Sequence, residues 1–170
     1  ALALGILDRY GVTTFCAPPT AYRMLVLEDL SRYDLSNLRH CTSAGEPLNP
    51  EVMRQWEEGT GMVIYDGYGQ TETVLLVGNY QCLPVRPGSM GKPVPGFVIG
   101  IVDDYGSVLP DGEEGQIAVK IKPNRPVGLF KEYWRDTEAM ERSFVGDWYL
   151  TGDKGYRDED GYYWFVGRAD

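Results

Sequence analysis

The chain has 170 residues, of which 43% are hydrophobic, and a net charge of −9. This length and apolar content suffice for one domain or two small ones with a packed core. The acidic charge and the scattered Lys and Arg residues argue against a nucleic-acid-binding surface, and no run of eighteen apolar residues predicts a membrane span. Three cysteines without a CxxC spacing favour a reducing compartment.

Residues 1 to about 80 alternate helix and strand patterns. Strands are predicted over residues 13–16, 38–43 and 62–66, and helices over residues 20–29 and 50–59. The helix at 50–59 has the clearest boundaries, with Asn49 as N-cap, Pro50 in the first turn and glycines at its end. This β-α-β-α-β order indicates a mostly parallel sheet.

After Pro84 the helix patterns give way to short alternating runs separated by turns. Strands are predicted over residues 97–102, 116–121, 148–150 and 162–166, with a short helix around 137–142. The expected fold class is therefore α/β followed by β-rich. Residues 1–84 would form half of a mostly parallel α/β subdomain, and residues 85–168 a small β-barrel-like subdomain.

Both ends of the chain look like cuts in a longer protein. Ala1 begins inside a helical pattern without an initiator Met, and Asp170 follows directly on a strand-like run. We therefore expect the chain to be a fragment.

The most informative segment is the polar cluster YDGYGQTE at residues 65–72, which follows a short buried strand. Ligands of open α/β sheets bind at the carboxyl ends of strands. Tyr68 offers a flat ring for a base, and the two glycines allow the backbone to approach a ligand closely. Thr71 offers a hydroxyl to a phosphate oxygen, and Glu72 offers a hard oxygen to Mg²⁺. Taken alone, the segment is equally compatible with a glycine-punctuated loop before a helix.

Three further positions have chemistry that suits a nucleotide. Residues 42–48, TSAGEPL, lie between a strand and a capped helix, and their small side chains would let the backbone meet a flat ligand edge. Asp153 follows a buried strand, and its carboxylate can accept from both hydroxyls of a ribose. Arg168 could reach ribose or phosphate oxygens. An ordinary βα loop and a turn Asp are the alternatives for the first two.

In series, these segments resemble the adenylate-forming superfamily, which contains acyl-CoA synthetases, luciferases and peptide-synthetase adenylation domains. The matching motifs are SAGEPL at 43–48, YGQTE at 68–72, YLTGD at 149–153 and FVGRAD at 165–170. The resemblance covers essentially the whole chain, and the residues around the motifs are most similar to medium-chain acyl-CoA synthetases.

This resemblance implies a ligase that activates a carboxylic acid with Mg·ATP, releases pyrophosphate and passes the acyl group from acyl-AMP to coenzyme A. The expected ligands are therefore ATP or AMP, Mg²⁺, coenzyme A and a small carboxylic acid. Acetate-specific relatives carry Trp where this chain has Gly69, so Gly69 is expected to open the acyl pocket to a longer or bulkier acid. The expected substrate is a medium-chain acid, with a short, branched or aromatic acid as the alternative. The phosphate loop and the C-terminal catalytic Lys of the family are not in this sequence, so the isolated chain is expected to be inactive.

The resemblance also assigns individual roles. The residues expected to bind the nucleotide are Gly45, Glu46 and Pro47 along the adenine, Tyr68 stacked against it, and Asp66, Gly67, Gly69 and Gln70 beside them. Thr71 would hold the α-phosphate and Glu72 the Mg²⁺, as the catalytic pair. Asp153 would grip the ribose with help from Arg168. Residues 169–170 would begin a hinge, centred on Asp170, to a missing C-terminal domain.

Two other functions and one question of compartment stay open at this point. The aromatic strands would also suit a non-enzymatic module that grips a sugar or peptide, provided that their rings are exposed. An adenylation domain that delivers to a carrier protein would share the same motifs. The expected compartment is the cytoplasm, or the mitochondrial matrix in a eukaryote.

Overall fold

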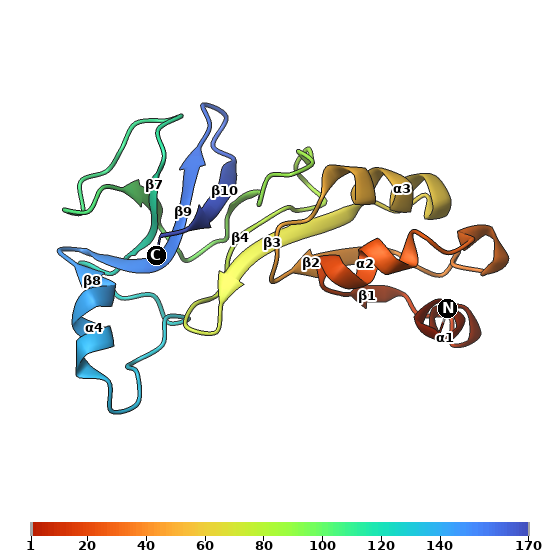
Figure 1. The fold of residues 1–170 in the computed structure, drawn as a ribbon, viewed down its shortest axis with the longest axis horizontal. Helices are drawn as coiled ribbons and strands as arrows, with labels where there is room; N and C mark the ends of the chain where they lie inside the picture. The colour runs from red at the N-terminus through yellow and green to blue at the C-terminus, as the bar shows by residue number, and fades with distance from the viewer. Residues whose placement is uncertain (1, 170) are drawn as a thin grey trace. The chain divides into compact units, whose positions relative to one another are not determined.

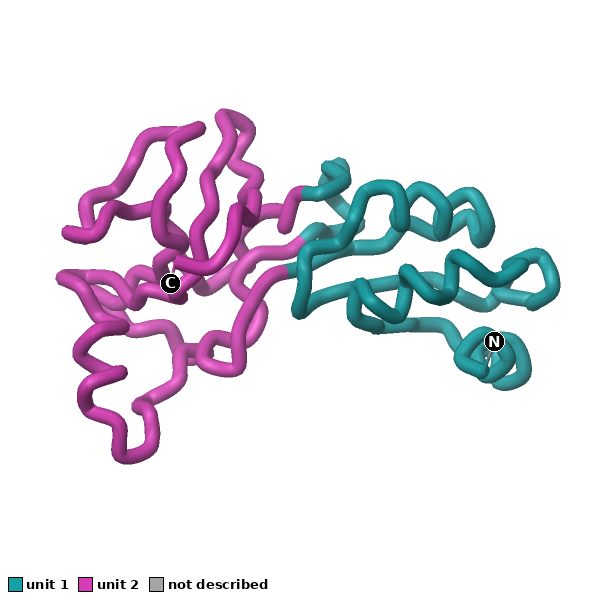
Figure 2. The backbone as a smooth tube through the Cα atoms, viewed as in Figure 1, with its two compact units in different colours: residues 1–67, 79–88 teal, residues 68–78, 89–170 magenta. Residues whose placement is uncertain are grey.

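The computed structural model describes residues 2–169 and divides into two compact units (Figure 2). Unit 1 comprises residues 1–67 and 79–88, and unit 2 comprises residues 68–78 and 89–170. The sequence predicts a single boundary between residues 84 and 85. The observed division instead interleaves the two units, because residues 68–78 belong to unit 2 while the segment that follows returns to unit 1.

Unit 1 is built from alternating helices and parallel strands, labelled in Figure 1. Its elements are α1 (Leu2–Arg9), β1 (Thr14–Cys16), α2 (Pro19–Leu25), the 3₁₀ helix η1 (Leu30–Arg32), β2 (His40–Ala44), α3 (Pro50–Thr60) and the first residues of β3 (Ile64–Gln70). Strand β2 pairs in parallel with both β1 and β3. This confirms the predicted parallel βαβαβ order.

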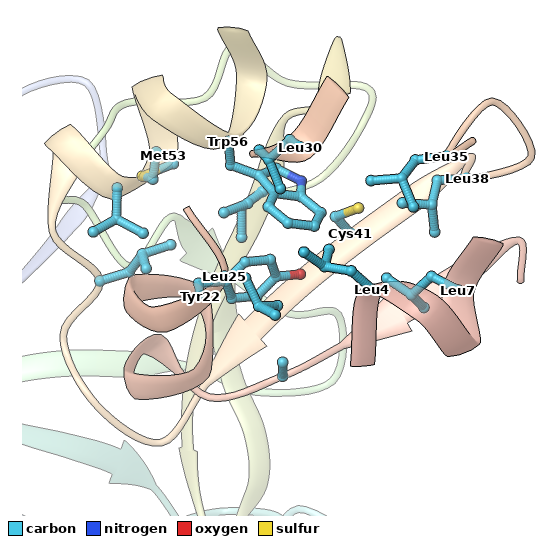
Figure 3. Close-up of a cluster of buried hydrophobic side chains, with 14 residues drawn as sticks. Leu4, Leu7, Tyr22, Leu25, Leu30, Leu35, Leu38, Cys41, Met53 and Trp56 are labelled. Atoms are coloured by element: carbon cyan, nitrogen blue, oxygen red, sulfur yellow. The ribbon is translucent and has the colours of Figure 1, made fainter. Parts of the chain in front are cut away.

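The core of unit 1 lies between the helices and one face of this sheet (Figure 3). Trp56 and Tyr22 are fully buried and meet edge to face, with ring centroids 5.1 Å apart. Helix α3 begins where Asn49 accepts a hydrogen bond from the Glu51 N–H at 2.8 Å, and it ends at Gly61, whose φ is +72°. The capping residues predicted from the sequence are thus the ones used.

Unit 2 contains a curled antiparallel sheet, one short helix and two strands, β4 (Val74–Gly78) and β5 (Lys92–Pro93), that are not part of this antiparallel sheet. Its other elements after the end of β3 are β6 (Ile99–Val102), β7 (Gly115–Lys120), α4 (Thr137–Ser143), β8 (Phe144–Val145), β9 (Trp148–Arg157) and β10 (Tyr163–Arg168). The main strand order is β10-β9-β7-β6, with β8 paired to β9. Tyr149 and Tyr163 fill its core with aliphatic neighbours. The expected β-rich, barrel-like part is confirmed.

Two strands extend further than the sequence predicts, and both carry candidate site residues. Strand β3 runs on to Gln70, so most of the polar cluster lies within a strand, and only Thr71 and Glu72 follow it. Strand β9 runs through Asp153, which was expected just after a strand. Glycines within the two segments resemble loop signals, but a strand can accommodate them where another backbone approaches closely.

None of the helices within residues 2–169 is long and apolar enough to cross a membrane.

Candidate functional site

Asp153 is the centre of a hydrogen-bonded network in unit 2. Its Oδ2 accepts from the Tyr68 hydroxyl at 2.6 Å and from Gln70 Nε2 at 2.8 Å. Its Oδ1 accepts from Arg168 Nη1 at 3.0 Å. These four residues come from β3, β9 and β10, and each was expected from the sequence to touch the nucleotide.

The hydrogen bonds of Asp153 bear on its expected contact with a ribose, which stays a prediction. The residue is only 5% exposed, and the two hydrogen bonds on Oδ2 use both lone pairs of that oxygen. A contact from both hydroxyls of a ribose, one to each oxygen, therefore requires Tyr68 or Gln70 to release Oδ2. In the structure as it stands, Oδ1 is the oxygen with room for a further donor.

Tyr68 is tied to this network by its hydroxyl. Burial raises the pKa of Tyr68, and the hydrogen bond that it donates to Asp153 raises that pKa further. The phenol therefore stays protonated and serves as a donor. Its stacking against an adenine stays a prediction.

The network continues to residues that the sequence did not single out as binding or catalytic. The Tyr149 hydroxyl donates to Gln70 Oε1 at 3.3 Å, and Gln70 Nε2 donates to the Thr151 carbonyl at 2.8 Å. The Tyr133 hydroxyl donates to Glu72 Oε1 at 3.1 Å. Tyr133 and Glu72 are 61 positions apart, so no local spacing could have found this contact.

Thr71 and Glu72 lie on the turn between β3 and β4. Thr71 is exposed and Glu72 is half-buried. Within residues 2–169 no group of three or more His, Cys, Asp or Glu side chains could hold a metal ion by itself. A cation at Glu72 would therefore take most of its ligands from phosphate oxygens and water, which is the usual arrangement for Mg²⁺.

Gly69, which was expected to open the acyl pocket, lies against the backbone of the turn that follows it. A Cβ added to Gly69 would lie 1.9 Å from the carbonyl oxygen of Val74. The backbone of the turn therefore occupies the space where any side chain would begin. Val74 itself has a φ of +55°, which is strained for a β-branched residue.

Unit 1 contains the remaining predicted nucleotide residues, which lie at the carboxyl end of β2 and on the neighbouring residues of β3. Ala44 pairs with Gly67 in the parallel register, and the loop at residues 45–47 follows directly. Gly45 has a φ of +99°, which this loop conformation requires of a glycine. The Glu46 carboxylate accepts a hydrogen bond from the Thr20 hydroxyl at 2.7 Å.

Two buried polar atoms lie side by side at this edge of unit 1. Ser43 and Asp66 are register partners on β2 and β3, and they are 2% and 7% exposed. Neither Ser43 Oγ nor Asp66 Oδ1 has a hydrogen-bond partner within the described part of the chain. Burial raises the pKa of Asp66 to about 7, against the opposing effect of the Gly67 and Leu48 N–H groups. A buried polar atom of this kind costs free energy unless water or another group satisfies it.

Each unit also contains a pocket. In unit 2, a pocket of about 410 Å³ is lined by Tyr133, Arg142, Arg168 and Thr151 among others, and no carboxylate among residues 2–169 lines it. In unit 1, a larger pocket of about 660 Å³ lies between α3 and β3 and contains none of the predicted site residues. The smaller pocket is the one with the donor-rich character that an anionic ligand needs.

One expected residue cannot be assessed. Asp170, the predicted hinge residue, lies outside the described residues. The last described contact at this end is a hydrogen bond of 2.9 Å from the Ala169 N–H to the Gly152 carbonyl.

Comparison with known sequences identifies one family and close relatives. A sequence model of the family described as "AMP-binding enzyme" matches residues 1–134. The mitochondrial acyl-coenzyme A synthetase ACSM3 of Rattus norvegicus is 53% identical over 167 residues, which are 98% of this chain and 29% of the relative. The mitochondrial acyl-coenzyme A synthetase ACSM4 of Homo sapiens is 50% identical over the same shares. The chain thus spans about three tenths of the length of these relatives.

Solved structures show the same fold. The crystal structure of the anthranilate CoA ligase AuaEII in complex with anthranoyl-AMP superposes with a TM-score of 0.90 at 40% identity, over 99% of this chain and 32% of that one. An acyl-CoA synthetase of Brucella canis gives a TM-score of 0.87 at 39% identity, over 99% of this chain and 31% of that one. The resemblance predicted from the motifs is confirmed.

Proposed function

Because the chain belongs to the AMP-binding enzyme family, we propose that it forms the nucleotide-binding part of an ATP-dependent acyl-CoA synthetase. In the full-length protein, a carboxylate oxygen of the acid would attack the α-phosphorus of ATP, and pyrophosphate would leave. The thiol sulfur of coenzyme A would then attack the acyl carbon of the acyl-adenylate, and AMP would leave.

The network around Asp153 is the observation that carries this proposal. Tyr68, Gln70, Asp153 and Arg168 were each singled out for nucleotide chemistry, and they converge through three hydrogen bonds of 2.6–3.0 Å. A buried carboxylate held by three side chains is preorganised to accept from a ribose hydroxyl. Arg168 would add a donor to the same sugar.

Glu72 and Thr71 would act on the phosphates. Among residues 2–169, the Glu72 carboxylate accepts a hydrogen bond on Oε1 from Tyr133, and its Oε2 would face a cation. Bound Mg²⁺ would offset the charge that develops on the phosphate oxygens during attack. The exposed Thr71 hydroxyl would donate to the α-phosphate, where negative charge increases in the transition state.

The adenine would meet the residues of unit 1. The backbone of Gly45, Glu46 and Pro47 offers flat peptide surface, and Gly67 adds no Cβ beside it. The unpaired oxygens of Asp66 and Ser43 are suited to the amino group and ring nitrogens of a base. Tyr68 would supply the stacking ring.

The proposed acid is a medium-chain one, because the residues around the motifs are most similar to that branch of the superfamily. An aromatic acid is the second choice, since the AuaEII structure contains anthranoyl-AMP. The relatives ACSM3 and ACSM4 are named as mitochondrial, and we propose the same compartment for a eukaryotic source of this chain.

The two competing functions are less well supported. A sugar- or peptide-binding module needs exposed rings on its strands, but Trp148, Tyr149 and Tyr163 are at most 8% exposed. Delivery to a carrier protein would use the same adenylation chemistry, and the relatives named above favour coenzyme A as the acceptor instead.

A product assay on a full-length protein that carries this segment tests the proposal. It would be incubated with ATP, Mg²⁺ and acetate, octanoate or benzoate, with and without coenzyme A, and pyrophosphate and acyl-CoA would be measured. We expect acid-dependent pyrophosphate release, and acyl-CoA only when coenzyme A is present. Pyrophosphate release without any acid dependence would exclude the proposed reaction.

A further inference from the structure

Glu72 lies on a turn whose backbone is fixed by its own hydrogen bonds. The Thr73 hydroxyl accepts from the Gln70 N–H at 3.0 Å, and the Thr73 N–H donates to the Gln70 carbonyl at 3.1 Å. Thr73 is fully buried beneath the turn. The Glu72 side chain has three rotatable bonds beyond this backbone, so a carboxylate that must meet a cation needs additional support.

A distant segment of unit 2 holds Glu72 at two points. The Phe130 N–H donates to the Glu72 carbonyl at 2.7 Å. The Tyr133 hydroxyl donates to Glu72 Oε1 at 3.1 Å. Residues 130–133 therefore fix both the backbone and the carboxylate of Glu72.

The Tyr133 ring is itself immobilised. It packs against Phe130 with ring centroids 4.6 Å apart, and the backbone N–H of Tyr133 donates to the Met140 sulfur at 3.3 Å. Arg125 donates to the carbonyls of Phe130 and Lys131, which anchors the segment before it reaches Glu72. These contacts therefore orient the Tyr133 hydroxyl toward the Glu72 carboxylate.

The chemistry of this contact suits a metal ligand. A phenol is a neutral donor, so it orients the carboxylate without offsetting its charge, whereas an Arg or Lys partner would compete with a cation. The contact uses Oε1 and leaves Oε2. The phenol also lines the pocket of about 410 Å³ in unit 2, so it borders space that a ligand can enter.

We propose that Tyr133 is a positioning residue that orients the Glu72 carboxylate toward the divalent cation of the adenylation reaction. The inference rests on the proposed function, because it needs Glu72 to be the protein's metal ligand. Supports of this kind typically change metal affinity by about 10–100-fold when they are removed.

The test compares Tyr133→Phe with its parent in a full-length protein that carries this segment. Tyr133→Phe keeps the ring that packs on Phe130 and removes only the hydroxyl. Pyrophosphate release would be measured against free Mg²⁺ concentration. We expect the half-maximal Mg²⁺ concentration to rise about tenfold, with unchanged kcat at saturating Mg²⁺ and unchanged melting temperature. The matched control is Tyr105→Phe, because Tyr105 is 88% exposed, and this variant should have the same Mg²⁺ dependence as the parent.

A double-variant cycle with Glu72→Gln separates positioning from a purely structural role. If Tyr133 acts through Glu72, adding Tyr133→Phe to Glu72→Gln should shift the Mg²⁺ dependence no further. Two results would overturn the inference and leave the proposed function intact. In one, the shifts in half-maximal Mg²⁺ concentration from the two single variants multiply in the double variant. In the other, Tyr133→Phe has the same Mg²⁺ dependence as the parent. An unchanged Mg²⁺ dependence in Glu72→Gln itself would remove the metal role of Glu72 and this inference together. A loss of thermal stability in Tyr133→Phe does not obscure the cycle, because both backgrounds carry it.

Discussion

Tyr68 and Asp153 are 85 positions apart in the chain, yet the Tyr68 hydroxyl donates to Asp153 Oδ2 at 2.6 Å. The contact joins the end of β3 to the middle of β9 within unit 2. It makes the residue proposed to stack on the base a direct support of the residue proposed to hold the sugar. A change at either position is therefore expected to affect both parts of a nucleotide.

Asp153→Ala should weaken nucleotide binding much more than acid binding. The change removes a charge-assisted acceptor and leaves the donors of Tyr68, Gln70 and Arg168 without it, so we expect a loss of about 2–3 kcal/mol in AMP binding. Calorimetric titration with AMP measures this. The exposed Glu159→Ala is the control and should bind as the parent does. Unchanged AMP affinity in Asp153→Ala would rule out the ribose role.

Asp66→Asn should change how the stability of the chain depends on pH. The pKa of Asp66 is raised from 3.8 to about 7 by burial, so between these values the unfolded state has lost a proton that the folded state keeps. Stability should therefore fall as pH rises from about 4 to about 7, by at most about 4 kcal/mol, and then level off. Below about pH 4 both states are protonated and the effect is absent.

Urea denaturation across this pH range tests the Asp66 prediction. Asp66→Asn should remove the fall in stability, because an amide does not titrate. Asp104→Asn, at an exposed position, should keep the slope of the parent. A variant at position 66 with the parent's slope would show that another group causes the effect.

Gly69→Ala should destabilise unit 2 by about 3 kcal/mol, because its Cβ would overlap the Val74 carbonyl and the turn would have to move. The control is Gly167→Ala, also on a strand of unit 2, where an added Cβ meets nothing within 4 Å. For Gly69→Trp in a full-length protein, activities with acetate and octanoate should fall together. A selective gain for acetate would instead support the acyl-pocket role predicted from the sequence.

Val74→Gly should stabilise the chain by about 1 kcal/mol, because glycine adopts a φ of +55° without the strain that a β-branched residue incurs there. Val127→Gly provides the comparison. Val127 is fully exposed and has no positive φ, so its change to glycine should be neutral or slightly destabilising. Chemical denaturation of both variants gives the two free energies, and a destabilised Val74→Gly would contradict the strain argument.

The sequence predicted those elements whose signals are local. Helix α3 was found because its N-cap Asn49, its first-turn Pro50 and the glycine after it all act within a few residues. The parallel order of β1, β2 and β3 followed from the alternation of elements. The extension of β3 to Gln70 was missed, because Gly67 and Gly69 are residues that usually end a strand. That the backbone at Val74 lies against Gly69 is known only from the structure.

The candidate site shows the same division between local and distant information. Motif chemistry pointed to Asp153, Tyr68 and Glu72, but not to the hydrogen bonds that organise them. The sequence around Tyr133 does not predict a role for it, because its partner Glu72 is distant in the chain and lies close only in the folded protein. The saturation of Asp153 Oδ2 was likewise invisible in the sequence, because its donors come from β3.

The positions of the tryptophans allow the fluorescence of the two units to be separated. Trp56 is the only tryptophan within the residues of unit 1, and it is fully buried, whereas Trp134, Trp148 and Trp164 all belong to unit 2. The fluorescence difference between the parent and Trp56→Phe therefore reports on unit 1 alone. Recorded during unfolding, it would resolve whether the two interleaved units lose their structure in one transition or in two.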